Sequence, residues 1–444
     1  MKNKNTNTYF IETYGCQMNI ADSELVENIL IKEGYIKSKN LKSADVIFIN
    51  TCAIREHAED KVFSQLGRYD LIKKDNPHVI IGVLGCMAQS LKDDLLENRP
   101  YVDIILGPDS YRNLPELLNR ANHRQSNLVD TKLSRFEVYD NLFPSRKDGV
   151  NAWISIMRGC DKFCTFCIVP FTRGRERSRS IPSIIKETKI AVDEGFQEIT
   201  LLGQNVNSYH YENNKFHTLL EHVSSINGVK RIRFTSPHPQ DITDELLYTM
   251  ANHDNICNYI HLPLQSGSNK ILRRMNRSYS KKYFLELAEK IRNILPGVGI
   301  STDIIVGFPG ETDEDFNKTL DVMNEVQFDS SFNFKYSIRK GTKASEYNDQ
   351  IQGNIKKDRL QKVIDLQKQH TLSRNLSLVG TTQTILVEKE SKMSNKEWAG
   401  RTDSNKWVIF KKQSACIKDM IPVQIFDAKG ITLRGKLIQK SEAA

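Results

Sequence analysis

Three apolar runs stand out in the first hundred residues, and each ends in a glycine or threonine followed by a cysteine. They are YFIETYGC at 9–16, DVIFINTC at 45–52 and HVIIGVLGC at 78–86. Amphipathic segments at Ala21–Glu33 and Glu56–Lys73 predict helices between these strands. Strands that alternate with helices form a parallel sheet with right-handed crossovers, so the three cysteines should share its carboxyl edge. We expect an open parallel sheet in an N-terminal domain over residues 1–125.

Six further strands are predicted after a polar, irregular stretch at 126–149 that is typical of a linker. They cover 153–157, 198–202, 231–234, 259–264, 300–306 and 332–336. Helices fit between them at Ser183–Glu194, Asp241–Asn252 and Tyr283–Ile294. Six strand-helix units fall short of the eight of a closed barrel. We therefore expect a partial (β/α)6 barrel over 150–375, with its chemistry at the carboxyl ends of the strands.

The last part of the chain changes to short strands of period two. A charged segment, KKDRLQKVIDLQKQH at 356–370, precedes them and predicts a solvated helix between two domains. The segments TTQTILVEKE at 381–390, KWVIFKK at 406–412 and IPVQIFDAKGITLRGKLI at 421–438 predict a small antiparallel β-barrel over 376–444. The whole chain is thus expected to have an α/β fold with three domains.

The positive charge is concentrated in this last domain. The chain of 444 residues has a net charge of +9, and residues 371–444 contribute +6 of it, from 13 Lys and Arg against 7 Asp and Glu. Small basic barrels often bind nucleic acid, and Trp398, Arg401, Lys406 and Trp407 are candidate contacts. The alternative is that Trp407 and Phe410 fill the barrel. No secretory signal is evident and the longest apolar stretch, near 79–88, has about ten residues, half of a membrane span. We expect a cytoplasmic protein with no membrane contact.

Six of the eight cysteines form two sets of three. One set is the run Cys160-x-x-x-Cys164-x-x-Cys167, and the other is Cys16, Cys52 and Cys86. Three thiolates on a four-iron cluster leave one iron open for another ligand. Structural zinc usually takes four ligands, and disulfides are disfavoured in a reducing compartment, so both fit less well. For the scattered set, packing of three thiols under loops is the alternative, and a zinc-containing RNA-binding protein is the alternative without catalysis.

The tight run resembles the signature of the radical S-adenosylmethionine enzymes, and the likeness extends further, to their methylthiotransferase family. The similar segments are YGCQMN, NTCAIREHAEDKVFSQLGR, LGCMAQ, MRGCDKFCTFCIVPFTRGRERSR, LLGQNVNSY, TSPHP, HLPLQSGS and DIIVGFPGET. The order of an N-terminal cluster domain, a radical domain and a small C-terminal barrel, the TRAM domain, also agrees. The resemblance covers nearly the whole chain.

This resemblance implies a function and its cofactors. Two 4Fe-4S clusters would be held by the two cysteine sets, and the Cys160 set would bind S-adenosyl-L-methionine and generate a 5′-deoxyadenosyl radical. The Cys16 set would hold the sulfur to be transferred, and a second S-adenosylmethionine would methylate it. An electron donor such as flavodoxin or ferredoxin is implied, and the sulfur donor is unknown. The segments AIREHAEDKVFSQLGR and GRTDSNKWVIF are most similar to the branch that adds a methylthio group to C2 of N6-isopentenyladenosine next to the anticodon of tRNA. The other branches modify threonylcarbamoyladenosine in tRNA or an aspartate of a ribosomal protein.

Polar residues near the strand ends are candidate contacts of S-adenosylmethionine, although each is also a common loop-capping residue. They are Gln204, Asn205, Thr235, Ser236, Gln265 and Asp303. Four arginines follow the tight cysteine run, at 173, 175, 177 and 179, and Glu176 interrupts this series of arginines. Arginine binds phosphate bidentately, so these side chains fit RNA contact, whereas an internal ion-pair network with Glu176 is the alternative.

Overall fold

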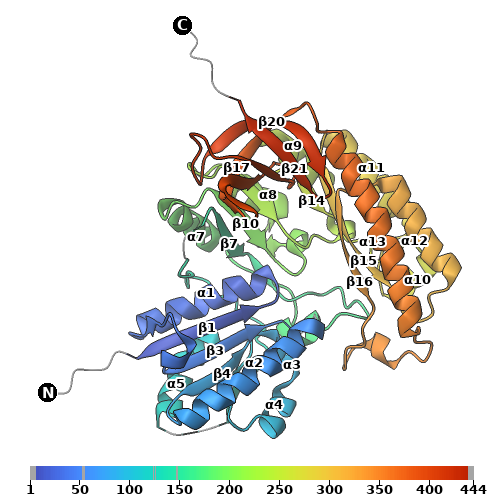
Figure 1. Ribbon diagram of the computed structural model, residues 1–444. Helices are drawn as coiled ribbons and strands as arrows, with labels where there is room; N and C mark the ends of the chain where they lie inside the picture. Colours follow the sequence, from blue (N-terminus) through green and yellow to red (C-terminus); the bar gives the residue numbers. More distant parts are fainter. Residues whose placement is uncertain (1–6, 53–55, 124, 126, 147–148, 439–444) are drawn as a thin grey trace.

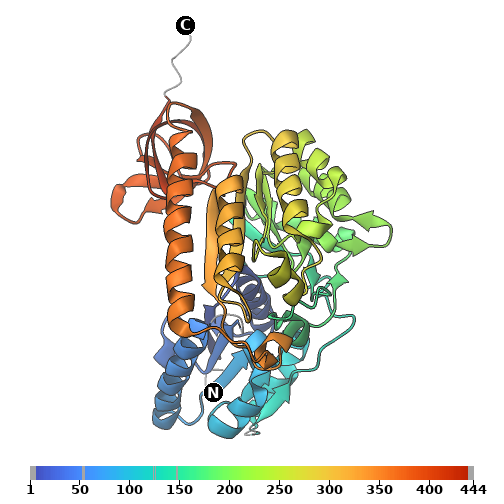
Figure 2. The ribbon, with the colours of Figure 1, turned by 90° about the vertical axis from the view of Figure 1, so that its right-hand side faces the viewer.

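Three domains follow one another along the chain in the computed structural model (Figures 1 and 2). The structure describes residues 7–52, 56–123, 125, 127–146 and 149–438. Residues 53–55, which begin one of the segments used to choose the branch, lie outside the described residues. The central domain lies between the N-terminal domain and the C-terminal barrel (Figure 1). Within the described residues, no helix has the length and apolar content needed to cross a membrane.

The N-terminal domain is a six-stranded parallel sheet covered by helices, as predicted. Its strands are β1 (Thr8–Tyr14), β2 (Ile36–Lys37), β3 (Val46–Thr51), β4 (Ile80–Leu84), β5 (Ile104–Leu106) and β6 (Leu128–Asp130), in the order β2-β1-β3-β4-β5-β6. Its helices are α1 (Gln17–Lys32), α2 (Glu56–Asp75), α3 (Cys86–Ser90), α4 (Lys92–Asn98) and α5 (Leu114–Asn122). Strands β3 and β4 are buried along their length because helices cover both faces. The beginning of the expected linker supplies β6.

The central domain contains the six predicted strands in two parallel three-stranded halves. They are β7 (Asn151–Ser155), β10 (Glu198–Leu202), β13 (Arg231–Phe234), β14 (Tyr259–His261), β15 (Gly299–Val306) and β16 (Ser330–Lys335). A parallel bridge between Ile232 and Ile256 links the halves. Two short antiparallel pairs are added: β8 (Met157–Arg158) with β9 (Arg177–Ser178), on either side of the tight cysteine loop, and the hairpin of β11 (His210–Tyr211) with β12 (Asn214–Lys215). The sequence prediction of an incomplete barrel is confirmed.

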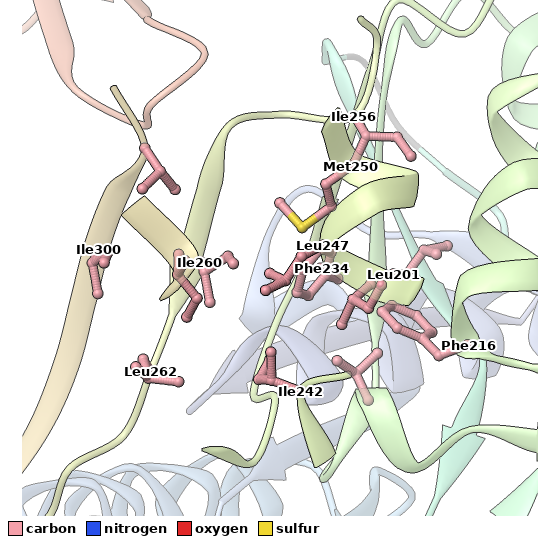
Figure 3. Close-up of a cluster of buried hydrophobic side chains, with 14 of the residues drawn as sticks. Leu201, Phe216, Phe234, Ile242, Leu247, Met250, Ile256, Ile260, Leu262 and Ile300 are labelled. Atoms are coloured by element: carbon pink, nitrogen blue, oxygen red, sulfur yellow. The ribbon is translucent and has the colours of Figure 1, made fainter. Parts of the chain in front are cut away.

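The helices of the central domain mostly pack on the outer side of these strands, whereas α6 packs on α3 of the N-terminal domain. They are α6 (Val169–Arg173), α7 (Ile181–Asp193), α8 (Phe216–Ser224), α9 (Asp244–Asn252), α10 (Asn269–Arg274), α11 (Lys281–Ile294), α12 (Asp313–Val326) and α13 (Gly353–Leu376). Figure 3 shows part of the core between the two layers, where Phe234 of β13, Leu247 of α9 and Ile260 of β14 point toward one another. Alternate residues of a strand face opposite sides. The residues next to Phe234 and Ile260 along their strands therefore face the interior of the barrel.

Helix α13 differs from the solvated helix that the sequence predicted. One face of it packs on β16 and is buried, including Lys356, Arg359, Gln367 and His370. The prediction is wrong for this face, where several of the buried polar groups form hydrogen bonds, such as Gln367 Nε2 to the carbonyl of Phe328 at 2.8 Å. Polar residues therefore occupy an interface that normally carries an apolar stripe.

The C-terminal domain is a closed five-stranded barrel. Its strands are β17 (Thr382–Ser391), β18 (Ser394–Arg401), β19 (Trp407–Lys411), β20 (Met420–Lys429) and β21 (Thr432–Leu437), in the order β17-β18-β19-β21-β20. Neighbours are antiparallel, as predicted, except that β19 and β21 pair in parallel. The barrel is seated on the first residues of the central strands: Arg231, which begins β13, donates to the carbonyls of Arg401 and Thr384 at 2.6 and 2.8 Å.

Candidate metal centres and their surroundings

The scattered cysteines follow three neighbouring strands of the N-terminal sheet. Cys16 and Cys52 come after β1 and β3, and Cys86 begins α3 after β4. Gly15, at φ +126°, allows the close approach, because a Cβ there would lie 2.7 Å from the Cβ of Cys52. Cys16 packs on a small apolar cluster that contains Met18 and Ala21 of α1 together with Leu202 of the central domain. This set of thiols therefore lies between two domains.

Electrostatic contacts favour negative charge on these thiols. A hydrogen bond with Cys52 is the largest cause that lowers the pKa of Cys16 to about 6, and the charge of Arg173 adds to it, against burial. Burial raises the pKa of Cys86, but the Nε of Arg173 donates to its Sγ at 3.1 Å. A guanidinium that donates to a thiol stabilises its thiolate, which is the form that binds metal.

The tight cysteine run forms the loop between β8 and α6. Arg277 donates to the Sγ of Cys164 at 3.4 Å, and Gln204 accepts from the backbone N of Gly159 at 2.6 Å. Burial raises the pKa of Cys160 to about 11 and that of Cys167 to about 12. A metal that binds here must therefore displace protons from thiols.

A buried carboxylate joins the two cysteine loops. Asp22 of α1 accepts from Arg158, which comes two residues before Cys160, and from Arg173 at 2.7 Å. Burial alone would raise the pKa of Asp22, but the two guanidiniums outweigh it and hold this pKa below its usual range. Since Arg173 also donates to Cys86, one chain of contacts runs from the tight loop to the scattered set.

The donors present suit iron–sulfur clusters better than zinc. Each set offers three thiols with an arginine donating to one of them, and three cysteines leave one iron of a four-iron cluster open. Across the described ranges, no three His, Cys, Asp or Glu side chains already stand in metal-binding geometry. The thiols of each set would have to close around a cluster as it binds.

The six candidate cofactor contacts lie at the carboxyl ends of the central strands, except Asp303, which lies within β15. Gln204 and Asn205 already hold neighbouring loops, Asn205 by donating to Asp241 at 2.8 Å. Thr235 is half-buried and Ser236, at φ +58°, is exposed. Gln265, at φ +65°, is buried and bridges to Ile304 of β15. Asp303 faces the interior, with its Oδ2 3.2 Å from the Nε2 of His261.

Three family models match the three domains. They are Uncharacterized protein family UPF0004 over residues 8–107, the Radical SAM superfamily over 154–323 and the TRAM domain over 376–438. A tRNA-2-methylthio-N(6)-dimethylallyladenosine synthase from Christiangramia forsetii is 45% identical over 99% of this chain and 96% of its own. Another of that name, from Amoebophilus asiaticus, is 46% identical over 97% of this chain and 93% of its own. This chain belongs to the tRNA-2-methylthio-N(6)-dimethylallyladenosine synthase family.

Solved structures show the same fold at low sequence identity. The radical S-adenosylmethionine methyltransferase TsrM from Kitasatospora setae has a TM-score of 0.58 at 12% identity, over 76% of this chain and 75% of its own. The cobalamin-dependent S-adenosylmethionine radical enzyme OxsB has a TM-score of 0.53 at 14% identity, over 82% of this chain and 56% of its own. The matching Radical SAM superfamily model, supported by this fold, implies that the chain uses a 4Fe-4S cluster and S-adenosylmethionine as cofactors.

The arginines after the tight loop form internal ion pairs, but not with Glu176. Their carboxylate partners are Asp22 for Arg173, Asp161 for Arg175, Asp109 for Arg177 and Glu187 for Arg179. Arg173, Arg177 and Arg179 are buried, so only Arg175 lies open to an RNA phosphate. Glu176 instead accepts from Ser208 at 2.8 Å and from Asn205 at 3.3 Å.

Of the residues in the barrel that were candidates for RNA contact, Arg401 and Lys406 make ion pairs with the central domain, and both tryptophans are partly buried. Arg401 donates to Glu198 of β10 at 2.7 Å, and Lys406 lies 2.7 Å from Asp329, so both hold the domain interface. Phe410 fills the barrel core, whereas Trp407 is half-buried under the amine of Lys389 at 4.4 Å. Trp398 is partly buried, and its Nε1 donates to the carbonyl of Ala415 at 2.7 Å.

Sequence reasoning missed the residues that hold the thiols. Asn19 accepts from the Sγ of Cys16 at 3.3 Å and donates to Asn50 at 3.1 Å. Both asparagines lie within three residues of a cysteine, a signal that could have found them. The arginine partners of Asp22 lie more than 130 residues away in the chain, and no local pattern indicates them.

Proposed function

We propose that this protein is a tRNA methylthiotransferase that adds a methylthio group to C2 of N6-isopentenyladenosine next to the anticodon. The observation that carries the proposal is the pair of three-cysteine sets, joined through Asp22, in a chain of this family. Two adjacent centres, each with an open coordination position, fit a reaction that needs both a radical source and a bound sulfur.

The two cysteine sets have different roles in this proposal. Cys160, Cys164 and Cys167 hold a 4Fe-4S cluster, and Cys16, Cys52 and Cys86 hold a second one that carries the sulfur. With S-adenosylmethionine bound, the first cluster supplies a 5′-deoxyadenosyl radical. Arg277 and Arg173 stabilise thiolates in the two sets. Asp22 fixes the positions of Arg158 and Arg173 and so holds the two loops at a constant separation.

The remaining proposed contacts follow from the strand ends and the basic barrel. Thr235, Ser236, Gln265 and Asp303 bind S-adenosylmethionine, while Gln204 and Asn205 support it and the cluster loop. The TRAM barrel binds tRNA phosphates, a flavodoxin or ferredoxin reduces the clusters, and the reaction takes place in the cytoplasm.

Cysteine variants test the two-cluster proposal. The anaerobic protein should hold about eight irons per chain, and Cys52→Ala about four. Cys52→Ala should abolish methylthiolation while reductive cleavage of S-adenosylmethionine stays measurable, whereas Cys160→Ala should lose both. The exposed Cys416 belongs to neither set, so Cys416→Ala is the matched control. Zinc without iron would contradict the proposal, as would loss of both activities in folded Cys52→Ala that retains four irons.

The substrate is tested by nucleoside mass spectrometry of tRNA from cells with and without the gene. Deletion should remove 2-methylthio-N6-isopentenyladenosine and leave its unthiolated precursor. Loss of a methylthiolated threonylcarbamoyladenosine, or of a modified ribosomal aspartate instead, would assign the protein to one of the other branches.

A further inference from the structure

Two phenylalanines of β16 face the interior of the barrel and remain about half exposed in the described structure. Ser331 Oγ and Asn333 Oδ1 are enclosed on the side of α13, so the alternate residues Phe332 and Phe334 point the opposite way. Their exposed fractions are 54% and 42%. Figure 1 shows α11, α12 and α13 together on the outer side of β15 and β16. Large apolar side chains that remain exposed inside a fold mark a ligand surface.

A fixed histidine stands beside these rings. His261 of β14 contacts Ser301 Oγ through Nδ1 at 2.8 Å and Asp303 Oδ2 through Nε2 at 3.2 Å. Ser301 is held in turn by the hydroxyl of Tyr259. Both ring nitrogens are therefore engaged, so the orientation of the His261 ring is determined before any ligand arrives.

The rings form a corner of aromatic surface. The centroids of His261 and Phe332 are 5.8 Å apart and their planes meet at 69°. Register places Phe332 opposite Asp303 and Phe334 opposite Ile305, so the corner continues along β16 as an apolar stripe. A flat heterocycle could stack on one ring and meet the edge of the other, while an apolar substituent covers the rest of the stripe.

We propose that this corner, formed by His261, Phe332 and Phe334, binds the target adenine and its apolar N6 substituent after the nucleotide has left the anticodon stack. This inference rests on the proposed function and names the binding site of its substrate. An enzyme that reacts at a base edge must extrude that base, and aromatic side chains commonly receive it. A prenyl group favours this site because its burial covers exposed phenylalanine surface. The adenine of S-adenosylmethionine has the same purine ring as the target base but lacks the apolar N6 substituent, so binding of the two ligands can be distinguished.

The experiment compares two anticodon stem-loop RNAs, one with N6-isopentenyladenosine and one with plain adenosine. Binding is measured by fluorescence anisotropy with S-adenosylmethionine and without reductant. The wild-type protein should prefer the prenylated RNA. Phe332→Ala and Phe334→Ala should each weaken its binding by about tenfold, the contribution of one stacked aromatic side chain. Binding of the unmodified RNA should change less, and the dissociation constant of S-adenosylmethionine should stay within twofold.

Phe136→Ala is the matched control, because this ring is 87% exposed and lies outside the barrel. Equal losses for both RNAs, or no loss, would overturn the inference. Weaker S-adenosylmethionine binding with an unchanged RNA preference would overturn it as well, by assigning the corner to the cofactor's adenine. Selective binding by a wild-type enzyme that does not methylthiolate the prenylated RNA would support the site and reject the proposed reaction.

Discussion

At the scale of single residues, the buried ion pairs explain how two cysteine loops from different domains stay together. The Asp22 side chain is fully buried and pairs with two guanidiniums, neither of which is more than 3% exposed. Removing one partner of such a group leaves an uncompensated buried charge, which costs far more than an exposed pair contributes. The same interaction fixes the donor to Cys86, so stability and the position of this thiol depend on one carboxylate.

Asp22→Asn should lower the free energy of unfolding by about 3 to 5 kcal/mol, because it removes the negative charge between Arg158 and Arg173. Urea unfolding of the metal-free protein measures this loss. Glu286 pairs with Lys282 on the exposed face of α11, and Glu286→Gln should cost at most about 0.5 kcal/mol. Equal costs for the two variants would show that Asp22 contributes no more to stability than an exposed ion pair does.

At the scale of elements, periodicity predicted the strands well and long-range pairing poorly. The predicted strands at 198–202 and 231–234 have the bounds of β10 and β13, because apolar runs between amphipathic helices leave few alternatives. Strand β18, with the sequence SNKEWAGR, was not predicted, because its polar side chains show no alternation and tertiary pairing determines it. The partners of the arginines at 173–179 depend on contacts between domains, which no local pattern encodes.

Helix α12 begins at a capping box that supports the loop after β15. The Oγ1 of Thr312 accepts from the backbone N of Asp315 at 3.2 Å, and Asp315 accepts from the backbone N of Thr312 at 3.1 Å. Thr312→Ala should therefore cost about 1 kcal/mol in the free energy of unfolding. Thr312→Ser keeps the hydroxyl and should cost much less. If thermal unfolding shows the same loss for both, the methyl group rather than the cap stabilises the helix.

At the scale of the whole molecule, the TRAM barrel is fixed to the central domain by buried charge. Glu198 of β10 is fully buried and accepts from Arg233 of β13 at 2.9 Å and from Arg401 of β18 at 2.7 Å. Arg233 also donates to the carbonyl of Thr402 at 2.8 Å. An interface of this kind resists the relative motion expected of two domains joined by a helix.

Glu198→Gln should loosen this interface, because two buried guanidiniums lose their shared negative charge. Hydrogen exchange of the β18 amides should become at least tenfold faster, a change that corresponds to about 1.4 kcal/mol in local opening. The control is Glu397→Gln, which removes a pair with Arg434 within the barrel itself. Unchanged exchange in β18, or equal acceleration in all three domains, would contradict the interface role.

The RNA-binding role of the barrel is best tested with point variants, since truncation would expose Arg231, Arg233 and Glu198. Lys411 and Lys436 are exposed on β19 and β21, which pair in parallel. Their double replacement by alanine should weaken tRNA binding irrespective of sequence and reduce the salt slope of log Kd by about two. Lys282→Ala, on exposed α11, should leave the slope unchanged. An unchanged slope in the double variant would exclude phosphate contact at these lysines.

The placement of the TRAM barrel has one more consequence. It sits where the central strands begin, whereas both cysteine sets lie where strands end, so the length of the barrel separates them (Figures 1 and 2). Strand β15 has eight residues, which corresponds to about 26 Å. The proposed base site lies part-way along this strand, since Phe332 pairs with Asp303, about 13 Å from where β15 begins. For the RNA proposed above, the phosphates on the TRAM barrel and the extruded base must be at least this far apart. The central domain would then select RNA by its dimensions. A folded stem-loop that spans this distance would bind, whereas a short or unstructured RNA would not, whatever its sequence.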